Sequence, residues 1–145
     1  MIDLETGELK LITGGRIGPL TRLETFRESI AGAGAEEVFH EGEWQAYRLL
    51  AAERPGRLFA VLLHFKGSQL LDLKLALHCD RFGGTREHWS QAGEQARKRA
   101  HDQVLASIFG ALPPYDLGWG TIQSVVGADG GTSVIWIRYR PPALA

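Results

Sequence analysis

The chain has 145 residues, a length that fits one domain. Hydrophobic residues make up 44% and charged residues 23%, a mixture that excludes a disordered or fibrous chain. Sixteen Lys and Arg against seventeen Asp and Glu give a net charge of -1, which provides no overall attraction to nucleic acid or an anionic membrane. We therefore expect neither nucleic acid nor a membrane as a partner.

Four features of the sequence indicate the compartment and the source. No apolar run approaches the ~18 residues of a membrane-spanning helix, and the acidic start of the chain does not read as a signal peptide. The single cysteine, Cys79, cannot form an internal disulfide, which suits a reducing compartment. Arg outnumbers Lys twelve to four, which indicates a GC-rich bacterium. We expect a bacterial, cytoplasmic domain over residues 1–140 with a C-terminal tail over residues 141–145.

The first part of the chain predicts a hairpin and a short helix. Residues 8–12 alternate as in a strand, and a Gly-Gly turn precedes residues 16–20. Apolar residues at helical spacing predict a helix over residues 22–31. Thr21, with Glu24 three residues later, has the spacing of a capping box.

The middle of the chain predicts three strands, over residues 44–50, 58–65 and 71–79. The third has the clearest alternation in the sequence, because one face carries only apolar residues and the other carries Asp72, Lys74 and His78. The apolar positions are Leu71, Leu73, Leu75, Leu77 and Cys79.

Burying the apolar faces of the second and third strands together fixes their register. With a three-residue loop at residues 67–69, His64 lies opposite Asp72 and Leu62 opposite Lys74. A histidine beside a carboxylate is either a solvated cross-strand pair or an oriented imidazole for catalysis.

A long helix is predicted over residues 91–109, with Ser90 as its N-cap and Gly110 at its end. Its expected buried stripe is Ala92, Ala96, Ala100, Val104 and Ile108, and its expected solvated side is Arg97, Lys98, Arg99 and Asp102. Strands over residues 121–126 and 132–140 follow, joined by a turn at residues 129–130.

The predicted fold is α+β: a single-layer, mostly antiparallel sheet of about five to seven strands, with two helices on one face. The expected order is β-β-α-β-β-β-α-β-β. The second face is then left for a partner, and Trp and Arg are enriched at the centres of protein interfaces. The predicted binding residues are Trp44, Arg48, His64, Asp72, His78, Trp136, Arg138 and Arg140.

Metal and cofactor chemistry have little support in the sequence. The cluster of His78, Cys79, Asp80 and His88 is the one set of potential ligands, but neighbours on a strand point to opposite faces. Phosphate-binding glycine loops and nucleophile-elbow motifs are absent from the sequence. We predict no metal, no cofactor and no catalytic residue.

His101 lies near the apolar boundary of the long helix, with Glu94 as the acid upstream on that face. Glu94 is two turns away, so a packing role is favoured over acid–base catalysis. We expect His101 to hydrogen-bond to the strand that Trp119 begins and to hold the helix against the sheet.

The C-terminal half resembles a small family of uncharacterised bacterial proteins. The resemblance covers about residues 88–140 and rests on three segments: Lys98-Arg99-Ala100-His101-Asp102, the strand that begins Trp119-Gly120-Thr121-Ile122, and Ile135-Trp136-Ile137-Arg138-Tyr139. This resemblance implies an α+β fold and a bacterial source, and it assigns no activity.

We interpret the chain as a non-catalytic bacterial protein-binding module, of the immunity or accessory type. One alternative is a small enzyme with a His and Asp site on the same face, using His64 and Asp72, or His78. Another is a structural homodimer whose paired sheets bury Trp136. The partner is accordingly another protein or a second copy of the chain.

Overall fold

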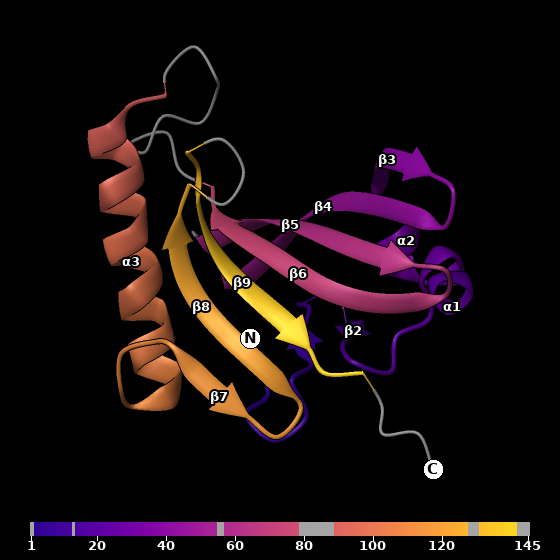
Figure 1. Ribbon diagram of the computed structural model, residues 1–145, viewed down its shortest axis with the longest axis horizontal. Coiled ribbons are helices and arrows are strands. Elements are labelled where there is room, and N and C mark those ends of the chain that lie inside the picture. Colours follow the sequence, from indigo (N-terminus) through magenta and orange to yellow (C-terminus); the bar gives the residue numbers. More distant parts are fainter. Residues whose placement is uncertain (1, 13, 55–56, 79–88, 128–130, 142–145) are drawn as a thin grey trace.

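A seven-stranded antiparallel sheet forms the body of the protein. The computed structural model describes residues 2–12, 14–54, 57–78, 89–127 and 131–141. The strands of the main sheet are β3 (Glu36–Glu41), β4 (Trp44–Arg54), β5 (Arg57–Lys66), β6 (Gln69–Leu77), β7 (Tyr115–Leu117), β8 (Gly120–Val126) and β9 (Ser133–Tyr139). Their order across the sheet is β3-β4-β5-β6-β9-β8-β7, so β3 and β7 are the edges (Figure 1).

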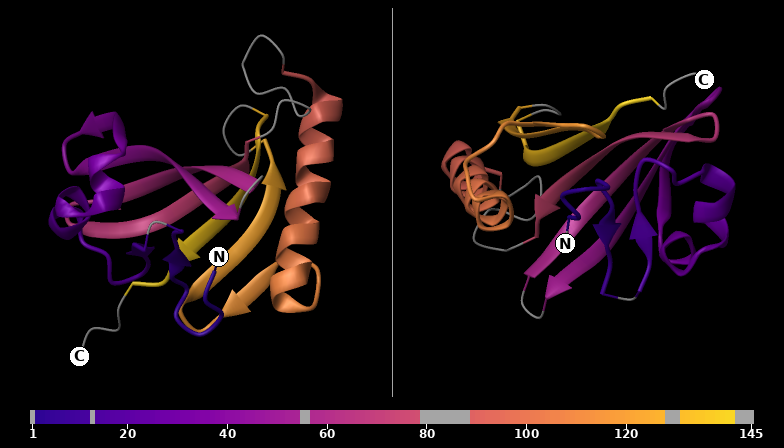
Figure 2. Two further views of the ribbon diagram at one scale, coloured as in Figure 1. Left: turned by 180° about the vertical axis from the view of Figure 1, so that it is seen from behind. Right: turned by 90° about the horizontal axis from the view of Figure 1, so that it is seen from below.

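The remaining elements lie on one face of this sheet. They are the hairpin of β1 (Leu9–Lys10) and β2 (Arg16–Ile17), and the helices α1 (Leu23–Glu28), α2 (Ile30–Ala33) and α3 (Gln91–Phe109). Figure 2 shows the strongly bent sheet, with the N-terminal elements inside the bend and α3 along β8. The predicted α+β class, with an antiparallel sheet and helices on one face, is confirmed.

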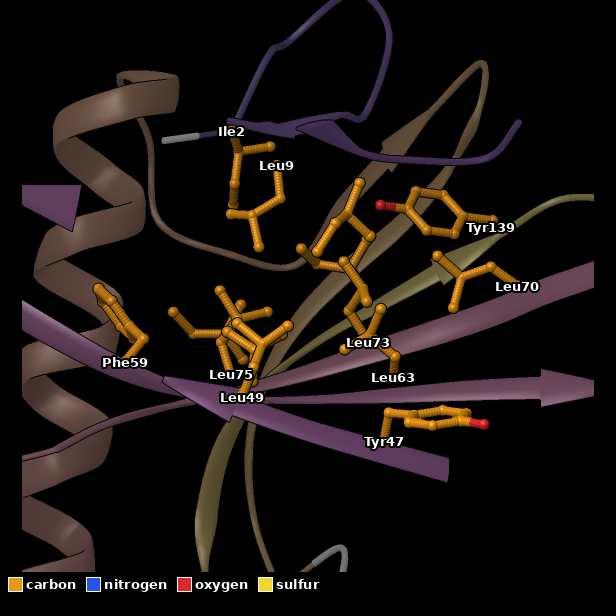
Figure 3. Close-up of a cluster of buried hydrophobic side chains, with 14 of the residues drawn as sticks. Ile2, Leu9, Tyr47, Leu49, Phe59, Leu63, Leu70, Leu73, Leu75 and Tyr139 are labelled. Atoms are coloured by element: carbon orange, nitrogen blue, oxygen red, sulfur yellow. The ribbon is translucent and has the colours of Figure 1, made fainter. Parts of the chain in front are cut away.

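The core fills the space between these elements and the sheet. Every second residue of β5 from Phe59 to Phe65 is at most 1% exposed, as the alternation predicts. Leu9 and Ile17 of the small hairpin and Phe26 of α1 pack on this row, and Phe26 meets Tyr47 edge-on at 5.6 Å between ring centres. Figure 3 shows part of this core, with Leu9 of the hairpin above Phe59, Leu63 and other apolar side chains of the main sheet.

The predicted order of elements omitted two edge strands, β3 and β7. All six residues of β3 are exposed, so its sequence has no apolar alternation to detect, and β7 has only three residues. The strands predicted over 44–50, 58–65, 121–126 and 132–140 correspond to β4, β5, β8 and β9.

The predicted capping box is wrong. Helix α1 begins one residue later, with Arg22 as its N-cap and without a side-chain cap. The Thr21 hydroxyl instead accepts a hydrogen bond from the Gly18 amide at 2.8 Å, and Glu24 accepts one from the Ser68 hydroxyl. The predicted helix also divides at Ser29, whose hydroxyl caps α2.

The register between β5 and β6 is the predicted one, but a shorter turn and a bulge produce it. The turn has two residues rather than three, and a bulge at His64 and Phe65 restores the pairing of His64 with Asp72. Because of the bulge, Leu70 rather than Leu71 takes the fully buried position beside Phe65. Cys79, predicted on the same face, lies outside the described residues.

Helix α3 has the predicted ends, but its buried face is different. The Ser90 hydroxyl caps it by accepting from the Gly93 amide at 2.9 Å, and Gly110 ends it with a φ of 78°. The predicted stripe is confirmed at Val104, which is 4% exposed, but not at Ala92, which is exposed. Arg97, expected in solvent, is only 6% exposed. The residues buried against the sheet are Glu94, Arg97, His101, Val104 and Leu105.

On the covered face, two hydrogen bonds join the N-terminal segment to Trp119, just before β8, and to Tyr139 at the end of β9. The Trp119 indole N–H donates to the Leu4 carbonyl at 3.0 Å, and the buried Tyr139 hydroxyl donates to the Gly7 carbonyl at 2.8 Å. Gly7 has a φ of 76°, and a Cβ there would lie 2.5 Å from the Trp119 ring. Only glycine fits both the backbone and the ring at this point.

We therefore expect Gly7→Ala to lower the free energy of unfolding by about 2 kcal/mol, through a strained φ and a clash with a packed ring. The measurement is urea unfolding, with Gly42→Ala as the control. Gly42 also has a positive φ, of 60°, but a Cβ there meets nothing within 4 Å. Equal losses in the two variants would contradict a packing role for Gly7 against Trp119.

Candidate functional site

The face of the main sheet opposite the helices is here called the outer face. One row of cross-strand neighbours runs across its centre through Arg48, Leu62, Lys74, Trp136 and Gln123, on β4, β5, β6, β9 and β8. The pairing of Leu62 with Lys74 is the predicted one. Alternation places these side chains outward because their neighbours along each strand enter the core.

A second row of cross-strand neighbours lies two residues along each strand from the first. It consists of His64 on β5, Asp72 on β6 and Arg138 on β9. His64 Nδ1 lies 2.7 Å from Asp72 Oδ1, and the two side chains are 29% and 20% exposed. The carboxylate orients the imidazole. The predicted pair is therefore present, and it lies beside the aromatic centre of the face.

Trp136 is the centre of this surface. The Lys74 ammonium lies 5.1 Å from its ring centre and the Arg138 guanidinium 4.5 Å away, both within the range of cation–π attraction. Two cations therefore hold one half-buried aromatic ring in place. A preorganised ring of this kind loses little side-chain entropy when a partner covers it.

The other predicted residues lie farther from this centre. Arg48 forms an ion pair with Glu36 of β3 at 2.9 Å. Trp44 is 46% exposed at the β3–β4 turn, with the Lys66 ammonium 5.3 Å from its ring. Both lie on the outer face, toward its β3 edge.

Arg140 and His78 are separated from the outer-face centre. Arg140 donates to the carbonyls of Leu117 and Gly118 and pairs with Asp116, so it fastens the β7–β8 turn. His78 is exposed beyond the far end of β6, about 20 Å along the strand from Asp72. The sequence had grouped both with Trp136.

A buried polar cluster under α3 was not predicted. The Glu94 carboxylate accepts two contacts from Arg97, at 2.5 and 2.7 Å, and one from the Ser133 amide at 2.8 Å. Glu94 is 1% exposed, and His101 and Ser133 are 0% exposed. The detectable signal was the spacing of Glu94, Arg97 and His101 at i, i+3 and i+7, which places them on one helix face.

The hydrogen bonds of His101 define its tautomer and exclude its use as a base toward Ser133. Its Nε2 accepts from the Leu77 amide at 3.0 Å, so the proton is on Nδ1, which lies 3.1 Å from the Ser133 hydroxyl oxygen. That nitrogen therefore donates, and the hydroxyl is not activated as a nucleophile. His101 joins α3 to β6 and β9, which confirms that it holds the helix against the sheet, but its partners are Leu77 and Ser133 rather than the strand that begins at Trp119.

Of two large cavities of the described chain, one lies away from the outer-face centre and the other borders it at Gln123, the cross-strand partner of Trp136. One of about 350 Å³ lies between the small hairpin and α1 and includes Arg16 and Arg22. Another, of about 430 Å³, lies between α3 and the free part of β8. Within the residues that the structure describes, no group of three His, Cys, Asp or Glu side chains is placed to hold a metal; Cys79, Asp80 and His88 fall outside them.

The comparisons with known proteins bear on the fold. No family model matches the chain, and no curated protein matches it. It is similar to one chain of a solved structure described as "Rhs1-CT in complex with cognate immunity protein RhsI1", with a TM-score of 0.61 and 16% identity, over 96% of this chain and 86% of that one. At this identity the likeness establishes a shared fold. No helix within the described residues is long and apolar enough to cross a membrane.

His101→Ala should destabilise the protein by about 3 kcal/mol and lower the Tm by roughly 10 °C. The substitution leaves the buried Leu77 amide without an acceptor and opens a cavity against Phe59. Thermal unfolding followed by circular dichroism measures the change. The control is His40→Ala, since His40 is exposed on β3; an unchanged Tm for the His101 variant would contradict its structural role.

The pKa of His101 also predicts a pH dependence of stability. Burial is the main cause that lowers this pKa to about 3, and Arg97 and Lys98 lower it further while Asp102 opposes them. The unfolded chain binds a proton near pH 6.5 and the folded chain does not, so stability falls as pH drops from about 6.5 toward 3, by up to about 1.4 kcal/mol per pH unit. In urea unfolding at pH 7, 6, 5 and 4, His101→Gln should lose less stability over this range than the wild type. Parallel curves would contradict the prediction.

Proposed function

We propose that this chain is a non-catalytic bacterial protein-binding module of the immunity type, and that it binds its partner protein with the outer face. The observation that carries the proposal is Trp136 held between Lys74 and Arg138 at the centre of a sheet face, with the helices packed on the opposite side. Trp and Arg are enriched among the residues that contribute most to binding at the centres of protein interfaces.

The charges on this face favour an acidic partner surface. Lys74 and Arg138 flank Trp136 at the centre. Farther out, Asp72 contacts His64, Arg48 pairs with Glu36, and Lys66 pairs with Glu43 beside Trp44. Two cations thus lie at the centre of this face, in a chain whose net charge is -1. Complementary charge speeds association and selects among partners more than it raises affinity.

The structural comparison supports the class of partner. The similar solved structure contains an immunity protein in complex with its cognate Rhs1-CT, so a chain with this fold takes part in a complex between two proteins. By analogy, the partner proposed here is a toxin domain that this chain neutralises by covering it.

The second candidate function is hydrolysis or proton transfer at His64 and Asp72. The 2.7 Å contact between them favours it, since the carboxylate would orient the imidazole for general base catalysis. A homodimer formed through Trp136 is a further candidate, and the experiment below distinguishes all three.

The setting proposed for this function is the bacterial cytoplasm, with one domain over residues 1–140. It rests on the single cysteine, on the excess of Arg over Lys and on the resemblance of residues 88–140 to small bacterial proteins. Neither a cofactor nor a nucleic acid takes part in the proposed binding.

Purified wild-type protein is used to capture partners from source-cell lysate, and each protein identified by mass spectrometry is then purified and titrated calorimetrically. We expect Trp136→Ala/Arg138→Ala to weaken binding at least tenfold, because truncating the centre of an interface typically removes 2 kcal/mol or more. The matched control is Trp89→Ala/Arg99→Ala, another exposed Trp and Arg. Equal losses in both variants would contradict binding by the outer face.

Co-expression separates the immunity role from binding alone. The captured protein should stop bacterial growth when expressed by itself, and the wild-type chain should restore growth while the Trp136→Ala/Arg138→Ala variant does not. A harmless partner contradicts the immunity role. If the only protein captured is a second copy of the chain, the homodimer is indicated. If the purified chain has a catalytic activity that His64→Ala removes, the enzyme is indicated.

A further inference from the structure

The edge of β8 is open over half of its length. β8 pairs with β9 from Gly120 to Val126, but it pairs with β7 only from Gly120 to Ile122 (Figure 1). Within the described residues, therefore, Gln123–Val126 has a strand on one side only. Half of the backbone N–H and C=O groups of such a segment point away from the sheet and remain available for pairing.

The chain itself does not extend β7 along this edge, for a reason that lies in its sequence. Continuing the register of Tyr115 with Ile122 would place Pro114 opposite Gln123 and Pro113 opposite Ser124. Proline has no backbone N–H and so does not donate to a ladder of this kind. The pairing stops at Tyr115 and leaves the edge open.

A groove lies along this open edge. Its volume is about 430 Å³, and its walls come from α3, from the segment before β7 and from β8. Its lining includes Lys98, Asp102, Pro113, Pro114, Gln123 and Ser124. The groove therefore offers a strand edge on one side and a helix with charged side chains on another.

Two buried oxygen atoms in the walls of this groove have no hydrogen-bond partner among the described residues: Asp102 Oδ1 and Ser124 Oγ. The other Asp102 oxygen accepts from the Lys98 ammonium at 2.9 Å, and the Asp102 side chain is 21% exposed. A buried acceptor without a donor is unfavourable. A hydrogen-bond donor entering the groove would remove this penalty.

The composition of this edge is also permissive for pairing. Gln123, Ser124, Val125 and Val126 are neutral, whereas the opposite edge strand β3 carries three glutamates and a bulge. Charges and bulges are the features by which proteins prevent strand addition. Of the two edges, the one beside α3 is therefore the better acceptor.

We propose that this groove binds an extended peptide segment of a partner protein, which pairs with Gln123–Val126 as an added strand and presents a hydrogen-bond-donating side chain to Asp102 and Ser124. The backbone of the segment supplies affinity, and the donor supplies specificity. The groove borders the outer face through Gln123, but its binding of a peptide does not depend on the function proposed above.

The probe is a panel of capped pentapeptides, acetyl-Thr-Val-X-Val-Thr-amide, with Lys, Arg, Asn or Glu at X. Each is titrated into the full-length ¹⁵N-labelled protein and followed by amide chemical shifts. We expect saturable shifts at Gln123–Val126 and in α3 near Asp102 for the Lys, Arg and Asn peptides, with a Kd at least fivefold higher for the Glu peptide. N-methylation of both valines should abolish the shifts, since it removes the backbone donors.

Asp102→Ala tests the anchor, and Gln103→Ala, an exposed neighbour on α3, is the matched control. The first variant should raise the Kd of the Lys peptide at least fivefold, and the second should leave it within twofold. The Asp102 side chain is 21% exposed and its ion pair with Lys98 is an i, i+4 contact within one helix, a kind of contact that contributes little to stability, so we expect the variant to fold. Absence of saturable shifts for all donor peptides, shifts confined to other surfaces, or equal affinity in both variants would overturn the proposal.

Discussion

The attachment of α3 to the sheet depends on one histidine. His101 accepts from the Leu77 amide at the end of β6 and donates to Ser133 at the start of β9, so a single ring joins the helix to two strands that are adjacent in the sheet. Glu94 adds the Ser133 amide to the same cluster. Polar contacts thus determine where the N-terminal half of the helix lies, and apolar contacts at Val104 and Leu105 complete the attachment.

The predictability of the fold follows from how each element is stabilised. β5 and β6 are buried on one face, so alternation gave their positions and the pairing of His64 with Asp72. β3 gains no burial and is stabilised by its hydrogen bonds to β4, which leaves no pattern to detect. The long helix was placed correctly by its caps, whereas its buried face was not. Arg97 is buried because it pairs with Glu94, and Glu94 in turn accepts from the Ser133 amide, 39 residues away in the sequence.

The candidate site was predictable to the extent that strand alternation and register determine it. Both placed Trp136, Arg138, His64 and Asp72 on one face, with Lys74 beside them. They could not show that Arg140 turns to the β7–β8 turn, since that contact depends on a strand of three residues. The groove along β8 was likewise outside sequence reasoning, because it depends on the absence of pairing beyond Tyr115.

The exposed strand β3 has a consequence for the behaviour of the protein at high concentration. Its outer edge carries Glu36, Glu37 and Glu41, and a bulge at Val38 interrupts its regular hydrogen bonding. Two such edges repel each other at low ionic strength, and the bulge misaligns their backbones. Salt weakens the repulsion but does not change the bulge. At high ionic strength, the misalignment caused by the bulge is then the feature that opposes edge-to-edge pairing of β3 between copies of the protein.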